Sequence, residues 1–193
     1  MSTPTLAPRR GLSERQAETV LKLIEAAAID AKALGFEATT MRTVASRAGV
    51  SSATVYSYFS SREHLFAELF RRRLDELEVE QLLDEARTPA DAVAALLAQI
   101  TEVVIDDPAI LTACTCSLLS SDPEVFRVRM EIGTQLAEAI GLALKDRATP
   151  EIVEAVLSSA FGLLVVAGMG HLEFAQLSKR ARTVTSLLLG EGP

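Results

Sequence analysis

The stretch TTMRTVASRAGVSSATVYSYF, residues 39–59, decides the fold. Its apolar spacing predicts two short helices, about 40–48 and 52–59, with a tight turn between them. Gly49 stands at the end of the first helix, where glycine readily adopts the left-handed backbone conformation. Either Thr39 or Thr40 caps the first helix, and either Ser51 or Ser52 caps the second, because the hydroxyls of both residue types accept from free backbone N–H groups.

Three residues in this stretch have the spacing of a helix-turn-helix. Ala45 is small enough to let the helices approach, Gly49 makes the turn, and Val55 packs the second helix onto the first. The same spacing also fits an ordinary helical hairpin with a solvated polar face. The outward positions of the second helix are short or hydroxylated, and none is acidic. Such a face can enter the major groove of DNA.

The predicted DNA-contacting set combines this outward face with nearby residues that can reach phosphates. Its members are Thr40, Arg42, Ser51, Ser52, Ala53, Thr54, Tyr56, Ser57, Tyr58 and Arg62.

The flanks of the stretch separate the two interpretations. An amphipathic helix precedes it, and an aromatic and serine-rich segment ending in Ser61-Arg62-Glu63 follows it. With these flanks the chain resembles the tetracycline-repressor (TetR) family of bacterial transcription regulators. The matching segments are 35–40, 44–45, 48–51, 54–59 and 61–63. The resemblance implies an all-α fold of nine helices, with a three-helix DNA-binding head on a helical-bundle body that binds an effector and dimerises.

The predicted organisation has three parts: a flexible arm (1–12), a DNA-binding head (13–60), and a ligand-binding and dimerisation body (61–193). The arm contains Arg9 and Arg10, which either contact DNA or remain solvated.

Capping signals place the first helices of the head and the body. Ser13 and Gln16 form a capping-box pattern that opens a helix ending at Leu34, which is assigned to its buried stripe. Ser60 and Glu63 repeat the pattern and open a helix predicted to continue to about residue 86. The cluster 71–73, three arginines, is predicted to be a solvated patch of that helix.

Four later boundaries share one device, a capping residue followed by proline at the first helical position. The pairs are Thr88-Pro89, Asp107-Pro108, Asp122-Pro123 and Thr149-Pro150. They delimit predicted helices 89–105, 108–120, 123–146 and 150–170, and a last helix follows over 172–189.

The net charge of −7 is unusual for a DNA-binding protein, but its distribution is informative. Residues 1–62 hold eight Lys/Arg and five Asp/Glu, whereas residues 63–193 hold eleven and twenty-one. A basic head on an acidic body is typical of a nucleic-acid-binding protein. Because the positive charge of one head is modest, two copies on one DNA site would bind more strongly.

Groups that would carry catalysis or hold a metal are scarce. His64 and His171 are the only histidines, and His64 is predicted to lie on the exposed side of its helix. Cys114 and Cys116 point roughly 200° apart on a helix, which makes a poor metal site. The sequence therefore predicts no enzyme, no cofactor and no metal site. Neither a signal peptide nor a disulfide scaffold is indicated, so a cytoplasmic location is expected.

The helices between residues 89 and 146 have the pattern of cavity walls, being mostly apolar with a few hydroxyls. The same pattern also fits a solid core. The predicted ligand-binding residues are Leu97, Ile100, Thr101, Val104, Leu111, Cys114, Thr115, Leu118, Phe126, Met130, Thr134, Phe161 and Val165. Arg127 and Arg129 are expected to face solvent, so the anticipated effector is small and apolar.

The predicted helix 150–170 is apolar on almost all sides, with Glu154 as the one charge after its first turn. It falls short of a membrane span and contains Ser158 and Ser159. Such a helix must be buried on all sides. It is either the centre of a monomeric core or, as we predict, part of a homodimer interface formed with the last helix.

Together these features predict a homodimer that binds a pseudo-palindromic operator in double-stranded DNA and responds to a small-molecule effector, with no membrane partner. Two alternatives remain open. One is a DNA-binding regulator of the same fold without a small-molecule ligand, constitutive or controlled by a partner protein. The other is a helical enzyme or carrier, which leaves the basic head unexplained.

Overall fold

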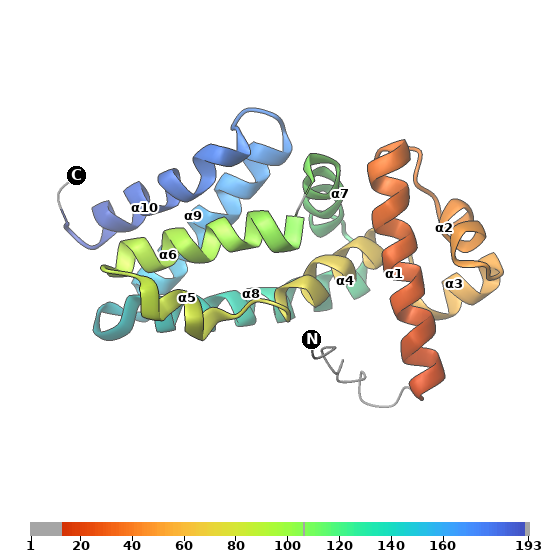
Figure 1. Cartoon of the computed structure of the whole chain (residues 1–193), viewed down its shortest axis with the longest axis horizontal. Coiled ribbons are helices and arrows are strands. Elements are labelled where there is room, and N and C mark those ends of the chain that lie inside the picture. The colour runs from red at the N-terminus through yellow and green to blue at the C-terminus, as the bar shows by residue number, and fades with distance from the viewer. Residues whose placement is uncertain (1–12, 106, 192–193) are drawn as a thin grey trace.

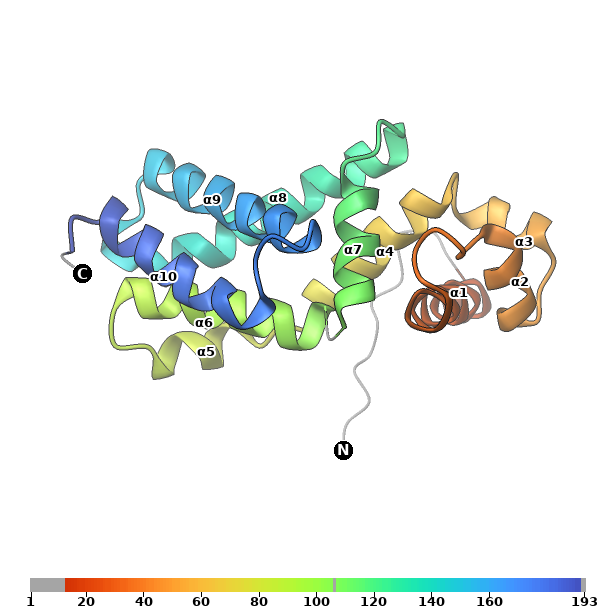
Figure 2. The ribbon, with the colours of Figure 1, turned by 90° about the horizontal axis from the view of Figure 1, so that it is seen from above.

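The computed structural model describes residues 13–105 and 107–191, except for the side chains of residues 103–105 and 174. The predicted arm, 1–12, lies outside the described residues. The described residues form ten α-helices and no β-strand. Figures 1 and 2 show an elongated molecule with α1–α3 at one end and the close of α10 at the other. The all-α prediction is confirmed, with one more helix than expected.

The head consists of α1 (Glu14–Leu34), α2 (Met41–Ala48) and α3 (Ser52–Tyr58). The predicted capping box of α1 is present, since Ser13 and Gln16 each accept from the other's backbone N–H. Leu34 does not belong to the buried stripe as predicted, because its side chain, at the last residue of α1, is 49% exposed.

Helix α4 (Arg62–Leu74) connects the head to the body, where it packs against α7 and α8 (Figure 2). The prediction of one helix continuing to about residue 86 is wrong: the chain turns after Leu74, and a short α5 (Val79–Glu85) follows. Leu77 packs against the core from this turn, where its N–H donates to the Leu74 carbonyl. The apolar spacing therefore continues although the helix does not.

The start of α4 also differs from the prediction. Its N-cap is Ser61, whose hydroxyl accepts from the His64 N–H, and not Ser60. His64 is buried rather than exposed, because α1, α7 and α8 cover this part of α4. The arginines at 71–73 are half-buried at the end of the helix and not a solvated patch. Burial, reinforced by the neighbouring Arg71, lowers the pKa of Arg72.

The body contains α6, α7, α8 and α9, and each begins at the predicted proline. Their bounds are α6 (Pro89–Gln99), α7 (Pro108–Leu118), α8 (Pro123–Leu144) and α9 (Pro150–Gly168). The preceding Thr88, Asp107, Asp122 and Thr149 all cap as predicted, with side-chain oxygens that accept from backbone N–H groups. A π-helical segment, η1 (Ile100–Ile105), extends α6.

The chain ends in α10 (Leu177–Leu188), which follows a 3-10 turn, η3 (Phe174–Gln176), and packs along α6 and α9 (Figure 1). One continuous apolar core runs from the head through α4 into the body. At the boundary, the Phe36 ring meets the Phe66 ring of α4 edge-on, with centroids 5.5 Å apart. The head is thus packed directly onto the helix that enters the body.

Candidate nucleic-acid interface and effector cavity

The helix-turn-helix has the geometry that its spacing predicts. Gly49 adopts the left-handed conformation, with φ 69° and ψ 30°. The turn is closed by the Val50 N–H, which donates to the Ala45 carbonyl at 3.0 Å. Ala45 and Val55 are buried between the helices. The second helix, α3, is thereby held at a fixed angle to α2, as a reading helix must be.

The outward face of α3 is short and polar, with one long aromatic side chain. Ala53 and Ser57 are exposed, and the Tyr56 side chain is 59% exposed. Tyr58 departs from the prediction, because it is half-buried and packs against the core. The surface available to a DNA groove therefore centres on the first two turns of α3.

Several predicted contact residues also hold the head together. Thr40 caps α2 in a reciprocal pair with Thr43, and Ser51 caps α3 by accepting from the Thr54 N–H. The hydroxyls of Ser51 and Thr54 are 2.9 Å apart. A hydroxyl that accepts in a cap still has a proton to donate to a phosphate oxygen. Arg42 is exposed at the start of α2, beside Thr40.

The prediction that Arg62 holds a DNA phosphate does not fit its surroundings. Its Nη1 donates to the carbonyl oxygens of Phe36 at 2.9 Å and Thr39 at 3.2 Å. Its Nη2 donates to Glu63 at 3.0 Å, and its guanidinium stacks 4.0 Å from the centroid of the Phe36 ring. Arg62 is thus committed to joining α4 to the loop between α1 and α2.

A cluster of polar side chains joins the head to α8. The hydroxyls of Ser60 and Ser61 donate to the same oxygen, Oδ2, of Asp122 at 2.8 and 2.6 Å. Asp122 also caps α8, since its Oδ1 accepts from the Glu124 N–H. His64 lies beside this serine–aspartate junction (Ser60, Ser61, Asp122), with its Nδ1 accepting from the Ser60 N–H at 3.1 Å.

The carboxylate of this junction is kept ionised by its hydrogen bonds. Burial alone would raise the pKa of Asp122. Hydrogen bonds from Ser61, Ser60 and the Glu124 N–H, with the nearby His64, outweigh that effect and leave the pKa below its ordinary value. The junction therefore holds a charge-assisted contact between the start of α4 and the start of α8.

Ion pairs continue this contact along α4 and α8. Arg71 on α4 donates to Glu68 at 2.9 Å and lies 3.7 Å from Glu131 on α8. Arg127 on α8 lies 3.8 Å from Glu68 and pairs with Glu131 at 2.6 Å. Movement of α8 would therefore be felt by the helix that enters the head.

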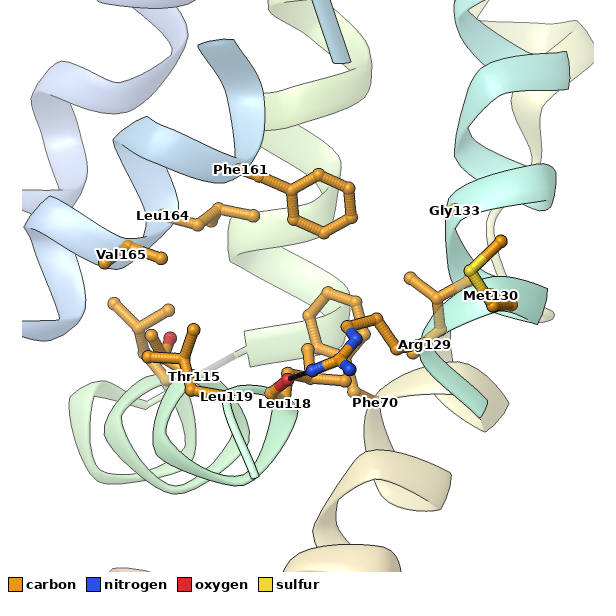
Figure 3. A pocket seen from close by; sticks show the side chains of 12 residues that line it. Phe70, Thr115, Leu118, Leu119, Arg129, Met130, Gly133, Phe161, Leu164 and Val165 are labelled. Carbon is orange, nitrogen blue, oxygen red and sulfur yellow. Dashed lines mark hydrogen bonds between the residues drawn. The ribbon is translucent and has the colours of Figure 1, made fainter. Parts of the chain in front are cut away.

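A cavity of about 370 Å³ lies between α7, α8 and α9, with Phe70 of α4 on its floor (Figure 3). That volume is within the range of small-molecule sites. Its walls are apolar except for the hydroxyl of Thr115 and the guanidinium of Arg129. The lining residues are Phe70, Leu111, Thr115, Leu118, Leu119, Arg129, Met130, Ile132, Gly133, Phe161, Leu164 and Val165. Helices α7 and α9 lie close together here, since a Cβ on Gly168 of α9 would meet Thr115 Oγ1 of α7 at 3.0 Å.

About half of the predicted ligand-binding residues line this cavity. They are Leu111, Thr115, Leu118, Met130, Phe161 and Val165. Cys114 does not, because its sulfur faces the Phe66 carbonyl in the core at 3.7 Å. The side chain of Val104 lies outside the described residues.

The other predicted lining residues lie elsewhere. Leu97 and Ile100 border a much smaller void that shares Phe161 and Leu164 with the cavity. Thr101 lines a surface hollow near α10, and its hydroxyl donates to the Ala98 carbonyl. Phe126 and Thr134 lie in a groove on the outer face of α8.

Six lining residues were missed: Phe70, Leu119, Arg129, Ile132, Gly133 and Leu164. Helical spacing offered a signal for one of them, because Leu164 stands three residues after the predicted Phe161 on the same helix. Arg129 is half-buried rather than solvent-facing. Its Nη1 donates to the Leu118 carbonyl at 2.6 Å, so it joins α8 to the end of α7.

The outer face of α9 and α10 is apolar and largely uncovered in the single chain. Only Val156, Leu164 and Ala167 of α9 are buried. Val166, Met169, Leu187 and Leu188 are exposed large apolar side chains. Helix α9 is long and apolar enough to cross a membrane, with a mean hydropathy of 1.8. Only 17% of its apolar stretch is buried within the single chain, so most of that apolar surface is uncovered. An apolar surface of this kind marks an interaction site.

Comparison with known proteins gives three informative matches and one family. Residues 23–69 match the family described as bacterial regulatory proteins, tetR family. The chain is 35% identical over 180 residues to an uncharacterized helix-turn-helix transcriptional regulator of Mycobacterium tuberculosis, covering 92% of this chain and 83% of the relative.

Two solved structures share the fold. A TetR transcriptional regulator from Rhodococcus sp. RHA1 superposes with a TM-score of 0.77 at 24% identity, covering 91% of this chain and 97% of that one. FadR of Thermus thermophilus, a TetR family transcriptional repressor solved in complex with lauroyl-CoA, superposes with a TM-score of 0.70 at 20% identity, covering 90% and 95%.

Proposed function

Because the chain belongs to the TetR family of bacterial transcriptional regulators, we propose that it is a homodimeric repressor, not an enzyme, released from its operator by a small effector. The observation that carries this proposal is the apolar cavity beside α4, the helix that leads into the head. In this proposal the effector is largely apolar and binds among α7, α8 and α9. The protein acts in the cytoplasm, where bacterial DNA lies.

The proposed DNA contact uses the exposed face of α3. Ala53 leaves room for close approach, Tyr56 reaches toward a phosphate or a thymine methyl group, and Ser52 and Ser57 face base edges. Thr40 and Arg42 hold the phosphate backbone. Two heads on one operator would be about 34–36 Å apart, one duplex turn, or more on a longer site.

The DNA contact can be tested by selecting bound sequences from a random duplex library with the purified full chain. We expect recovery of a pseudo-palindromic site. Ala53→Glu, which adds a charge that phosphates repel, should recover none while keeping the thermal unfolding temperature of wild type. Enrichment of the same site by Ala53→Glu would show that this face does not read DNA.

The effector site can be tested by filling the cavity. Gly133 lines it, and a Cβ added there meets no atom within 4 Å, so Gly133→Leu places a side chain in the open space. Gly141→Leu is the matched control, because it lies on the same helix, has equal room and does not line the cavity.

The readout is release of the selected operator by dodecanol and by dodecanoate, measured by fluorescence anisotropy. Wild type and Gly141→Leu should release DNA with one or both compounds, and Gly133→Leu should remain bound. Equal release from both glycine variants would place the effector elsewhere. Release by neither compound from any form would favour a regulator controlled without a ligand of this class.

A further inference from the structure

The cavity has one charged group in its wall, and that group lacks a counterion. Arg129 is the only charged side chain among the twelve lining residues. It is half-buried, and no carboxylate of the described residues lies within salt-bridge distance of it. Its neighbour Arg127, by contrast, pairs with Glu124 and Glu131. A half-buried cation without a counterion can pair with a bound anion, and the pair forms in a place that is partly shielded from water.

The guanidinium has hydrogen-bonding capacity left for such an anion. Nη1 donates to the Leu118 carbonyl at 2.6 Å, and the centre of the group lies 5.4 Å from the centroid of the Phe126 ring. No other acceptor contacts it among the described residues. An arginine carries five N–H donors in a planar fork suited to a carboxylate. Figure 3 shows it reaching from α8 along the edge of the cavity toward Leu118 at the end of α7.

Arg129 also lies at the mouth of the cavity and not in its depth. The two most exposed lining residues are Leu119 and Met130, at 63% and 56%. Met130 follows Arg129 in the chain, and Leu119 follows the residue whose carbonyl Arg129 binds. The deeper walls, from Leu111, Ile132 and Leu164, are buried and apolar. Polarity is thus arranged from an apolar interior to a cationic rim.

The surface beyond the mouth does not suit a polyanion. Met130 also borders the groove on the outer face of α8, whose charged residues are Arg127, Glu131 and Glu138. Arg127 is already paired with Glu131 at 2.6 Å. A head group with several phosphates would meet more negative than positive charge there, with no unpaired cation to hold it.

From this geometry we infer that the effector is an amphipathic monoanion, an alkyl or other apolar body with one carboxylate, held by Arg129 at the cavity mouth. The inference rests on the proposed function. It excludes a coenzyme A thioester as the ligand that this chain binds best. The carboxylate would bind the free N–H donors of Arg129 beside its bond to the Leu118 carbonyl. The ligand would therefore act on the side chain that joins α7 to α8.

The test measures binding of three probes to the full-length dimer by isothermal titration calorimetry near neutral pH: dodecanoate below its micellar concentration, dodecanol, and lauroyl-CoA. A hydrogen-bonded charge adds about 1.5–3 kcal/mol. Dodecanoate should therefore bind about 10- to 100-fold more tightly than dodecanol, at about tenfold for each 1.4 kcal/mol. Lauroyl-CoA should bind more weakly than dodecanoate.

Three variants assign the effect to Arg129. Arg129→Gln, which removes the charge, should bind dodecanoate no better than dodecanol while its affinity for dodecanol is retained. Arg129→Lys should keep most of the preference for the carboxylate, and its behaviour remains informative if the glutamine variant folds poorly. Arg127→Gln, two residues earlier on the same helix and exposed, should change neither affinity.

The outcomes separate this inference from the proposed function. If dodecanol binds as tightly as dodecanoate, or lauroyl-CoA binds most tightly, the carboxylate assignment is wrong and the effector cavity stands. An unchanged preference in Arg129→Gln would likewise overturn the role of Arg129. If none of the three probes binds, the inference is overturned, and the proposed function would have to dispense with an effector of this class.

Discussion

The contacts inside the head of this chain differ in kind from the contacts inside its body. Side-chain caps begin helices in both parts, but in the head the side chains of Arg47 and Arg62 also bond separate segments to one another. In the body, α6–α10 pack mainly through apolar side chains, around a cavity and beneath an uncovered apolar face. A reading face must keep a fixed geometry. Apolar walls can part for a ligand without breaking hydrogen bonds.

The largest effect is expected from a substitution on the uncovered apolar face of the body. Val166 is 41% exposed on α9, and Val166→Glu should turn the proposed dimer into monomers and abolish operator binding. An uncompensated charge buried in an interface costs about 3–5 kcal/mol, and the dimer would bury two. Sedimentation equilibrium measures the state. Leu142→Glu, on α8 and 58% exposed, is the matched control. Dissociation by Leu142→Glu instead would move the interface off α9.

The next effect compares a truncation in the head with one in the cavity wall. Phe59 is 1% exposed beneath α3, so Phe59→Ala should lower the free energy of unfolding by about 3–5 kcal/mol. Phe161→Ala should cost distinctly less, because its half-buried ring already borders empty space. Urea unfolding of both variants at one protein concentration gives the comparison. Equal losses would mean that the body is as tightly packed as the head.

A third prediction separates two arginines of the head by role. Arg62→Met leaves the Phe36 and Thr39 carbonyls without their donor, which should cost about 1–3 kcal/mol of stability. It should leave the salt dependence of DNA binding unchanged. Arg42→Ala should do the reverse, with wild-type stability and a salt slope smaller by about 1. A shallower salt slope for Arg62→Met would restore the original prediction of a phosphate contact.

The smallest effect concerns pH at the serine–aspartate junction. Since the pKa of Asp122 is lowered on folding, its contribution to stability is fully present above its ordinary pKa of about 3.9. That contribution is lost as the pH falls through the lower, folded-state value. The difference in melting temperature between wild type and Asp122→Asn should therefore shrink as the pH drops below about 4. Asp84→Asn, at an exposed carboxylate, is the control. A difference that is constant with pH would contradict the role of the charge.

The features that the sequence predicts well are those decided within a few residues. The cap of α2, the turn at Gly49 and the four proline starts depend on local backbone groups. The turn and the proline starts are found where expected, and the cap is the second of the two threonines that the sequence offered. The cap of α4 and the burial of His64 were predicted wrongly, because they depend on tertiary contacts. Ser60 and the cap residue Ser61 both donate to Asp122, about sixty residues away in the chain, and local spacing contains no sign of that contact.

The cavity was predicted only as far as one helix face can define it. Leu111, Thr115 and Leu118 share a face of α7, so their spacing identified them together. Phe70 reaches the cavity from α4, and no pattern within α4 distinguishes it from an ordinary core residue. Arginine is a residue type typical of the surface, and only its hydrogen bond to the Leu118 carbonyl on α7 shows that Arg129 faces inward.

The loop between α7 and α8 links the cavity to the start of α4 by a short path. Arg129 binds the carbonyl of Leu118, and Asp122, four residues later, holds the two serines at the start of α4. The proposed coupling between effector binding and DNA binding therefore need not pass through the core of the body. Allosteric coupling free energies are typically about 1–3 kcal/mol. A single hydrogen bond to a charged group is worth about 1.5–3 kcal/mol. The contact at Leu118 is thus, by itself, of the magnitude that switching between bound and released operator requires.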